Sequence, residues 1–154
     1  MSNLPDILPE GYQYSSDISA AEVVDLRSVS GWGTEKNIEL WQRVIDESIA
    51  SIGVRNKTDE LVGVGFLAGN SRHAVLCDFI VSPHHRGIGL GRAILNKRVN
   101  IADELNIPYL YTELAPTNSL RTYYEDLGFI ATGHAYTRAA RRHPSEIAEM
   151  GRQH

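Results

Sequence analysis

The chain has little cysteine, no long apolar run and no strong charge of either sign. Cys77 is its one cysteine, which excludes an internal disulfide and suits a reducing compartment. No stretch approaches the roughly 20 apolar residues that a membrane-spanning helix needs, and the first ten residues hold two prolines and two acids instead of a basic and apolar signal region. The net charge of -4 argues against general nucleic-acid binding. We therefore expect a cytoplasmic protein with neither a nucleic-acid nor a membrane partner.

Two kinds of site are missing from the sequence as well. The six histidines are scattered and no pair has the spacing of metal ligands, so we predict no metal site. A P-loop needs a glycine followed by lysine and then serine or threonine, and the sequence contains no Gly-Lys pair. The glycine-rich segment that the chain does contain is of a different kind.

That segment joins an apolar strand, residues 74–81, to a helical pattern, residues 92–105. It holds three glycines in five residues: Gly87, Gly89 and Gly91. Glycines permit positive φ and close approach of a bulky group, and the first amides of a helix attract negative charge. Arg86 and Arg92 add positive charge on either side. The pattern predicts a cradle for a phosphate or pyrophosphate group.

A dinucleotide-binding loop is one alternative for this cradle. Its G-x-G-x-x-G pattern would need a third glycine at position 92 or 94, where the chain has Arg92 and Ile94. Glu113 nevertheless follows at about the distance of a ribose-binding acid. A nucleotide-dependent oxidoreductase is therefore disfavoured, although its acidic residue is present.

The pattern Arg86-x-x-Gly89-x-Gly91 resembles motif A of the GCN5-related N-acetyltransferases, the GNAT superfamily. A second segment, residues 118–129, resembles a later motif of the same superfamily, in which an Asn precedes a short helix that ends in Tyr-Glu-x-x-Gly-Phe. Two motifs in the right order, with a strand between them, are far more specific than either alone. The resemblance covers residues 61–136.

This resemblance implies an α/β (α+β) GNAT fold. A mixed central sheet of about six to seven strands would be flanked by about four helices, with parallel strands splayed around the CoA site. We expect one domain over residues 1–154, with a lead-in at 1–11 and a tail at 144–154.

Local patterns predict where the elements lie. Four helices are expected at residues 20–29, 35–48, 92–105 and 119–127, with Ser19 and Thr34 capping the first two. Strands are expected at residues 12–15, 51–55, 61–68, 74–81, 109–114 and 129–138, the last as a strand or one half of a hairpin.

The resemblance also implies acetyl-CoA as co-substrate and assigns its contacts. The loop would bind the pyrophosphate and the preceding strand the pantetheine arm. Asn118 looks like the superfamily's CoA-contacting Asn, with Thr117 as a substitute. The residues expected to bind CoA are Phe79, Ile80, Val81, Arg86, Gly87, Ile88, Gly89, Leu90, Gly91, Arg92 and Asn118.

For catalysis, the resemblance makes Tyr124 the general acid, because it is the Tyr of the Tyr-Glu-x-x-Gly-Phe motif. Glu113 is the candidate base, with Asp78 or water as alternatives. Trp32 and Tyr111 are candidates for binding the acceptor. The expected activity is direct acetyl transfer to a primary amine of a small molecule. A protein or peptide acceptor, or a non-catalytic CoA-binding sensor, are the alternatives, and the sheet edges offer surfaces for a homodimer.

Overall fold

The computed structural model describes residues 4–31, 35–113, 121–131 and 138–142. Within these ranges the chain forms a sheet of seven strands, four α-helices and one short 3-10 turn. In chain order the elements are β1 (Gln13–Ser15), α1 (Ala20–Val29), α2 (Ile38–Glu47), β2 (Ala50–Arg55), β3 (Leu61–Gly69), β4 (His73–Val81), the 3-10 turn Pro83–His85, α3 (Leu90–Glu104), β5 (Tyr109–Glu113), α4 (Arg121–Asp126), β6 (Phe129–Ala131) and β7 (Arg138–Arg142).

The sheet is mixed, as expected. Its strand order is β1-β2-β3-β4-β5-β7-β6, and β4 and β5 are the parallel pair. The remaining neighbours pair antiparallel. Helix α3 connects β4 to β5, because parallel neighbours need a crossover connection.

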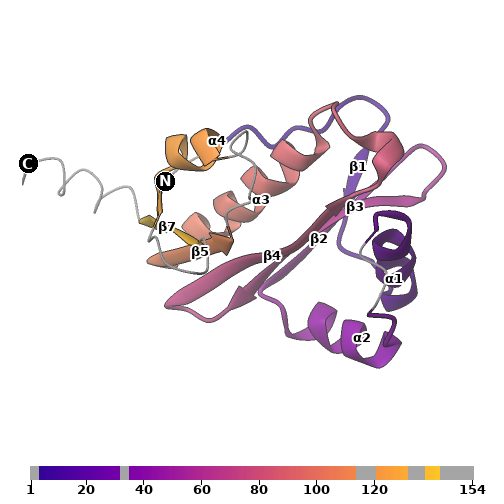
Figure 1. Cartoon of the computed structure of the whole chain (residues 1–154), viewed down its shortest axis with the longest axis horizontal. Coiled ribbons are helices and arrows are strands. Elements are labelled where there is room, and N and C mark those ends of the chain that lie inside the picture. Colours follow the sequence, from indigo (N-terminus) through magenta and orange to yellow (C-terminus); the bar gives the residue numbers. More distant parts are fainter. Residues whose placement is uncertain (1–3, 32–34, 114–120, 132–137, 143–154) are drawn as a thin grey trace, which may run out of the picture.

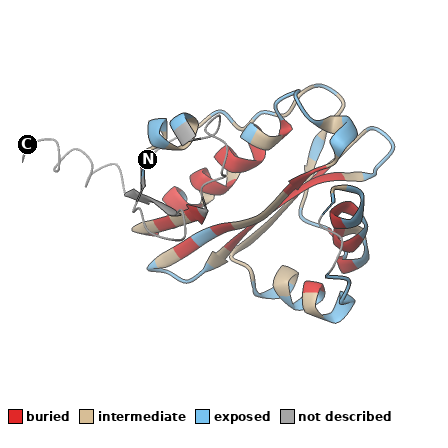
Figure 2. Cartoon of the chain, viewed as in Figure 1, coloured by how far each residue is buried: buried red, intermediate tan, exposed pale blue. Residues whose placement is uncertain are grey.

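Helices cover both faces of the sheet (Figure 1). Helices α3 and α4 lie on one face, and α1 and α2 lie on the other. Residues of α3, such as Leu95 and Val99, form a buried cluster with Leu76 and Leu110 of the strands. A second cluster joins α1 and Trp41 of α2 to the opposite face. Burial therefore concentrates along the central strands and the inner face of α3 (Figure 2).

The helix ends follow local chemistry. Ser19 is the N-cap of α1, as predicted, and it forms a full capping box with Glu22. The prediction for α2 was wrong: its N-cap is Asn37, whose side chain accepts the Leu40 amide at 3.1 Å, and not Thr34. Asn106, with a φ of +55°, follows the end of α3. None of the helices in the described part of the chain is long and apolar enough to cross a membrane.

The last part of the sheet differs from the expectation of one strand or hairpin half over residues 129–138. Strand β6 covers only Phe129–Ala131 and pairs antiparallel with β7, which begins at Arg138 and lies between β5 and β6. Strand β7 pairs with β5 from Glu113–Arg138 to Tyr109–Arg142, and with β6 on its other edge. This pairing satisfies the backbone of both neighbours, so the strand forms from long-range contacts and not from an apolar pattern of its own.

Candidate functional site

The parallel strands β4 and β5 separate part of the way along. Their pairing runs from His73–Tyr109 to Leu76–Thr112, while β4 continues to Val81. The second half of β4 therefore leaves β5 and leads to the glycine-rich loop (Figure 1). Ligands in open α/β sheets bind at such an opening at the carboxyl ends of the strands.

A β-bulge marks the start of this separated half. In the antiparallel pairing with β3, Val64 faces Ile80 and Phe66 faces Cys77, so Gly65 faces two residues, Asp78 and Phe79. Asp78 has a φ of +51°, in the left-handed region that side chains other than glycine seldom adopt. Bulges re-aim strands and leave backbone groups unpaired, and they are frequent beside active sites.

The loop after β4 forms an open cradle. Gly87 and Gly89 have φ values of +79° and +97°, and a Cβ added to either would meet nothing within 4 Å. Gly89 is the N-cap of α3 and supplies no side-chain hydrogen bond to the first amides of the helix. At Gly91 the reason for glycine is close packing, since a Cβ would lie 2.9 Å from Cζ of Phe79. These features suit an anion at the helix N-terminus.

A cleft of about 300 Å³ lies along the end of β4 and beside the cradle. Arg86 is tied to it, because its Nε donates to the Val81 carbonyl at 2.9 Å. Ile88 is exposed, whereas Leu90 is buried below the loop. The lining combines the strand and loop residues that the sequence singled out, namely Phe79, Ile80, Val81, Arg86, Gly87, Leu90 and Gly91, together with His85.

Two adjacent tyrosines on α4 have different surroundings. The Tyr123 hydroxyl donates to Oδ1 of Asn96 at 2.6 Å, and burial raises the pKa of Tyr123 above its usual value. The Arg92 guanidinium lies over the Tyr123 ring, 4.5 Å from its centroid. The half-buried Tyr124 ring packs edge-on against Phe129, with centroids 5.4 Å apart. Tyr123 thus anchors α4 to α3 through its hydroxyl. Tyr124 contacts Phe129 through its ring.

The face of β4 toward α1 carries a charged pair at the bulge. Nη1 of Arg27 lies 3.4 Å from Oδ1 of Asp78. The Arg27 guanidinium also lies over the ring of Trp41, 4.5 Å from its centroid. Arg27 is nearly buried, whereas about a third of the Asp78 side chain is exposed. The sequence pattern singled out Asp78 as an alternative base, but nothing in it pointed to Arg27 as the partner of Asp78.

A family model described as an acetyltransferase (GNAT) domain matches residues 16–143. This chain belongs to the GNAT acetyltransferase family. The match contains β4, the cradle and α4, so the resemblance of the two motifs is confirmed at the level of the family. No curated protein sequence matches the chain at a significant level.

Solved structures share the GNAT fold at low sequence identity. The ribosomal-protein-S18-alanine N-acetyltransferase of Escherichia coli has a TM-score of 0.71 and 15% identity, covering 85% of this chain and 93% of that chain. The spermidine/spermine N-acetyltransferase SpeG of Vibrio cholerae has a TM-score of 0.67 and 16% identity, over 92% and 99%. The PaiA N-acetyltransferase of Thermoplasma acidophilum in complex with coenzyme A has a TM-score of 0.63 and 17% identity, over 86% and 99%.

Trp32 and Asn118 lie outside the described residues, and so does the alternative Thr117. Glu113 is described through its backbone alone, which ends β5 and pairs with Arg138. Tyr111 is half-buried in the same strand, and His73 of β4 stacks on its ring with centroids 6.0 Å apart.

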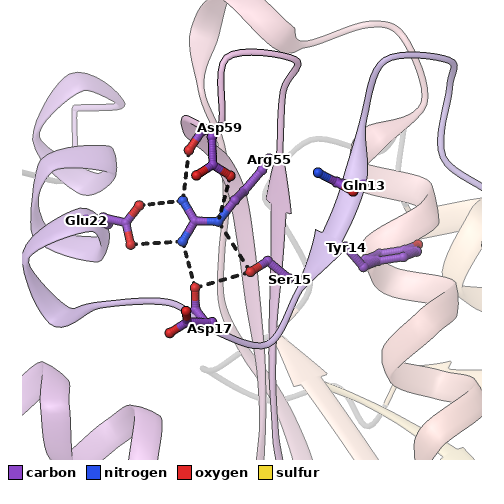
Figure 3. A pocket seen from close by; sticks show the side chains of 7 residues that line it. All are labelled: Gln13, Tyr14, Ser15, Asp17, Glu22, Arg55 and Asp59. Atoms are coloured by element: carbon purple, nitrogen blue, oxygen red, sulfur yellow. Dashed lines mark hydrogen bonds and ion pairs between the residues drawn. The ribbon is translucent and has the colours of Figure 1, made fainter.

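Another cavity, of about 490 Å³, lies away from the cradle, between β1, α1 and β2 (Figure 3). Arg55 occupies its centre and binds both carboxylate oxygens of Glu22, at 2.6 and 3.0 Å. The same guanidinium donates to Ser15 Oγ and to the carbonyls of Asp17 and Asp59. Since every donor of Arg55 is engaged, this cluster joins three elements and leaves the arginine no donor for a ligand.

Proposed function

We propose that this GNAT acetyltransferase moves an acetyl group from acetyl-CoA to a primary amine of a small molecule, by direct transfer within a ternary complex. The observation that carries the use of acetyl-CoA is the open cradle at the N-terminus of α3, placed where β4 leaves β5. Acetyl-CoA supplies the activated acetyl thioester. The chain supplies binding, orientation and proton transfer.

The residues present fit the co-substrate. Amides between Gly87 and Arg92 would hold the pyrophosphate, because the loop is open above Gly87 and Gly89. The cleft along Phe79, Ile80 and Val81 would take the pantetheine arm. A backbone amide of the bulged strand would donate to the thioester carbonyl and stabilise the charge that develops there.

Tyr124 is the proposed general acid and would give its hydroxyl proton to the leaving sulfur. Tyr123 is unsuited to this role, because its hydroxyl already donates to Asn96. Glu113, at the end of β5, is the proposed base that removes the proton of the amine. Asp78 is the alternative, since its partly exposed carboxylate lies at the bulge and is held in place by Arg27.

A small cationic amine suits the charge of the chain. The net charge is -4, and Asp25 and Glu60 line a cavity of about 360 Å³ beside α1. The structural neighbour SpeG is a spermidine/spermine N-acetyltransferase, whereas the E. coli neighbour is a ribosomal-protein-S18-alanine N-acetyltransferase. A protein or peptide acceptor is therefore the second candidate. We further propose a cytoplasmic location and a homodimer.

A thiol-release assay with acetyl-CoA tests the proposal. The acceptors would be polyamines, amino sugars, amino acids and short peptides with free N-termini, with an acceptor-free reaction as control. We expect release above the control with at least one small amine. Release with the peptides alone would assign the second candidate. Binding of acetyl-CoA without turnover on any acceptor would indicate a non-catalytic CoA-binding domain.

A further inference from the structure

Arg98 of α3 is a fully buried cation inside the GNAT core. It is 1% exposed, and among the residues whose burial is described it is the largest side chain that is almost completely buried. No carboxylate in the described part of the chain lies within ion-pairing distance of its guanidinium. Removing a cation from water costs free energy, and a protein with an apolar side chain of similar volume at such a position is often no less stable. The arginine therefore calls for an explanation besides core packing.

The hydrogen bonds of Arg98 join α3 to the strands beside the bulge. Nη1 of Arg98 donates to the Phe66 carbonyl of β3 at 3.1 Å and, at a longer 3.5 Å, to the Cys77 carbonyl of β4. Phe66 and Cys77 are the pair that precedes the bulge. Nε of Arg98 lies 3.4 Å from the Ile94 carbonyl of its own helix. One guanidinium thus links α3 to both strands where β4 changes register.

The opposite strand leaves room for this arrangement. A Cβ on Gly65 would lie 2.9 Å from both Cζ and Nε of Arg98. Gly65 is also the residue that faces Asp78 and Phe79 across the bulge. The small residue and the large cation therefore form one packing unit.

The same cation also lies near the cleft of the candidate site. Its Cζ is 5.4 Å from the centroid of the Phe79 ring, and Phe79 lines the cleft. Burial lowers the pKa of Arg98 from its usual 12.5 to about 10. Arg98 therefore stays charged at neutral pH.

We propose that Arg98 is a positioning residue, which fixes the β4 bulge so that its backbone amides hold their geometry around the thioester. The catalytic part of this inference rests on the proposed function. When reacting groups are misplaced by about 1 Å, the rate can fall roughly a hundredfold. We call the contacts of Arg98 with the carbonyls of Phe66 and Cys77 the clamp. Its effect on the bulge can be tested without measuring enzyme activity.

The test compares Arg98→Met with Lys97→Met, a matched control one position away on α3. Lys97 is partly exposed and contacts Asp6 and Tyr14, not the bulge. Hydrogen exchange measured by mass spectrometry would report on peptides that contain residues 77–81, with peptides of β2 as internal reference. Arg98→Lys, which keeps the charge, serves as a further variant in case Arg98→Met does not fold.

We expect Arg98→Met to speed exchange in residues 77–81 more than in β2, with Arg98→Lys intermediate and Lys97→Met unchanged. We also expect kcat with acetyl-CoA to fall roughly tenfold or more in Arg98→Met while the Kd of CoA changes by less than about threefold. Unchanged exchange in residues 77–81 would overturn the clamp. Faster exchange with unchanged kcat would overturn the positioning role. A wild-type protein that neither binds nor uses acetyl-CoA would instead refute the proposed function, and the exchange data would still decide the clamp.

Discussion

The hydroxyl of Tyr123 on α4 donates to Oδ1 of Asn96 on α3 at 2.6 Å. This bond fixes a helix of six residues, Arg121–Asp126, against the longest helix of the structure as described. The next residue of α4 is Tyr124, the proposed acid. Two tyrosines that are neighbours in the sequence thus have separate tasks: one anchors the helix, and the other is positioned by that anchor.

Replacing Tyr124 by Phe removes the proposed proton donor and keeps the ring that packs against Phe129. We expect kcat to fall on the order of a hundredfold, the usual scale of lost proton transfer, with CoA binding retained. Steady-state kinetics together with calorimetry of CoA binding would check this. Unchanged turnover would remove Tyr124 from the mechanism.

Tyr123→Phe is the matched variant. It removes the hydrogen bond to the buried Asn96 and leaves a polar acceptor without that donor, at a cost of about 1–3 kcal/mol. We expect a lower melting temperature and a smaller loss of kcat than in Tyr124→Phe. The assignment of roles would be reversed if Tyr123→Phe lost turnover while Tyr124→Phe kept it.

The base is tested by Glu113→Gln and Asp78→Asn, compared under the same conditions. We expect Glu113→Gln to lower kcat by about 10²- to 10⁴-fold at neutral pH, with recovery at higher pH where more of the amine is already deprotonated. Asp78→Asn keeps the shape of the side chain but loses its charge toward Arg27. If Asp78→Asn shows the large loss and Glu113→Gln does not, Asp78 is the base.

The Glu22–Arg55 pair predicts a pH dependence of stability. Hydrogen bonds from Arg55 chiefly, and from Ser19 in addition, lower the pKa of Glu22 from 4.5 to about 2. Because the folded value lies below the unfolded one, the stabilisation is complete above pH 4.5 and is lost as the pH falls toward 2. We expect the melting temperature of wild type to exceed that of Glu22→Gln at neutral pH, and the difference to shrink in acid. An equal difference at neutral pH and at about pH 3 would contradict the pair's role.

Local patterns predicted the elements around the cradle well. The apolar run of β4, the glycines and the helical periodicity of α3 are close in sequence, and each has a direct conformational consequence. The N-cap of α2 was missed because Thr34 and Asn37 are both good caps, and the side-chain bond from Asn37 to the Leu40 amide decides between them only in three dimensions.

The bulge and its supports depend on contacts between distant residues. An unbroken apolar strand gives no sign of a change in register, and Asp78 was the one irregular residue within it. Its partner Arg27 is 51 positions away in the sequence, on helix α1, which packs against the sheet. Arg98 carries a charge, and charged side chains are seldom fully buried, yet the space that Gly65 leaves open lets this side chain enter the core. Such pairings follow from tertiary packing, so local periodicity did not predict them.

Calorimetric titration with acetyl-CoA tests the central claim most directly, with NAD as the competing ligand. The matched variants are Gly89→Glu and Gly31→Glu, since both glycines have positive φ and open space around a would-be Cβ, but only Gly89 lies in the cradle. We predict that wild type and Gly31→Glu bind acetyl-CoA, that Gly89→Glu does not, and that NAD does not bind. Binding of NAD without acetyl-CoA, or undiminished acetyl-CoA affinity in a folded Gly89→Glu variant, would contradict the account.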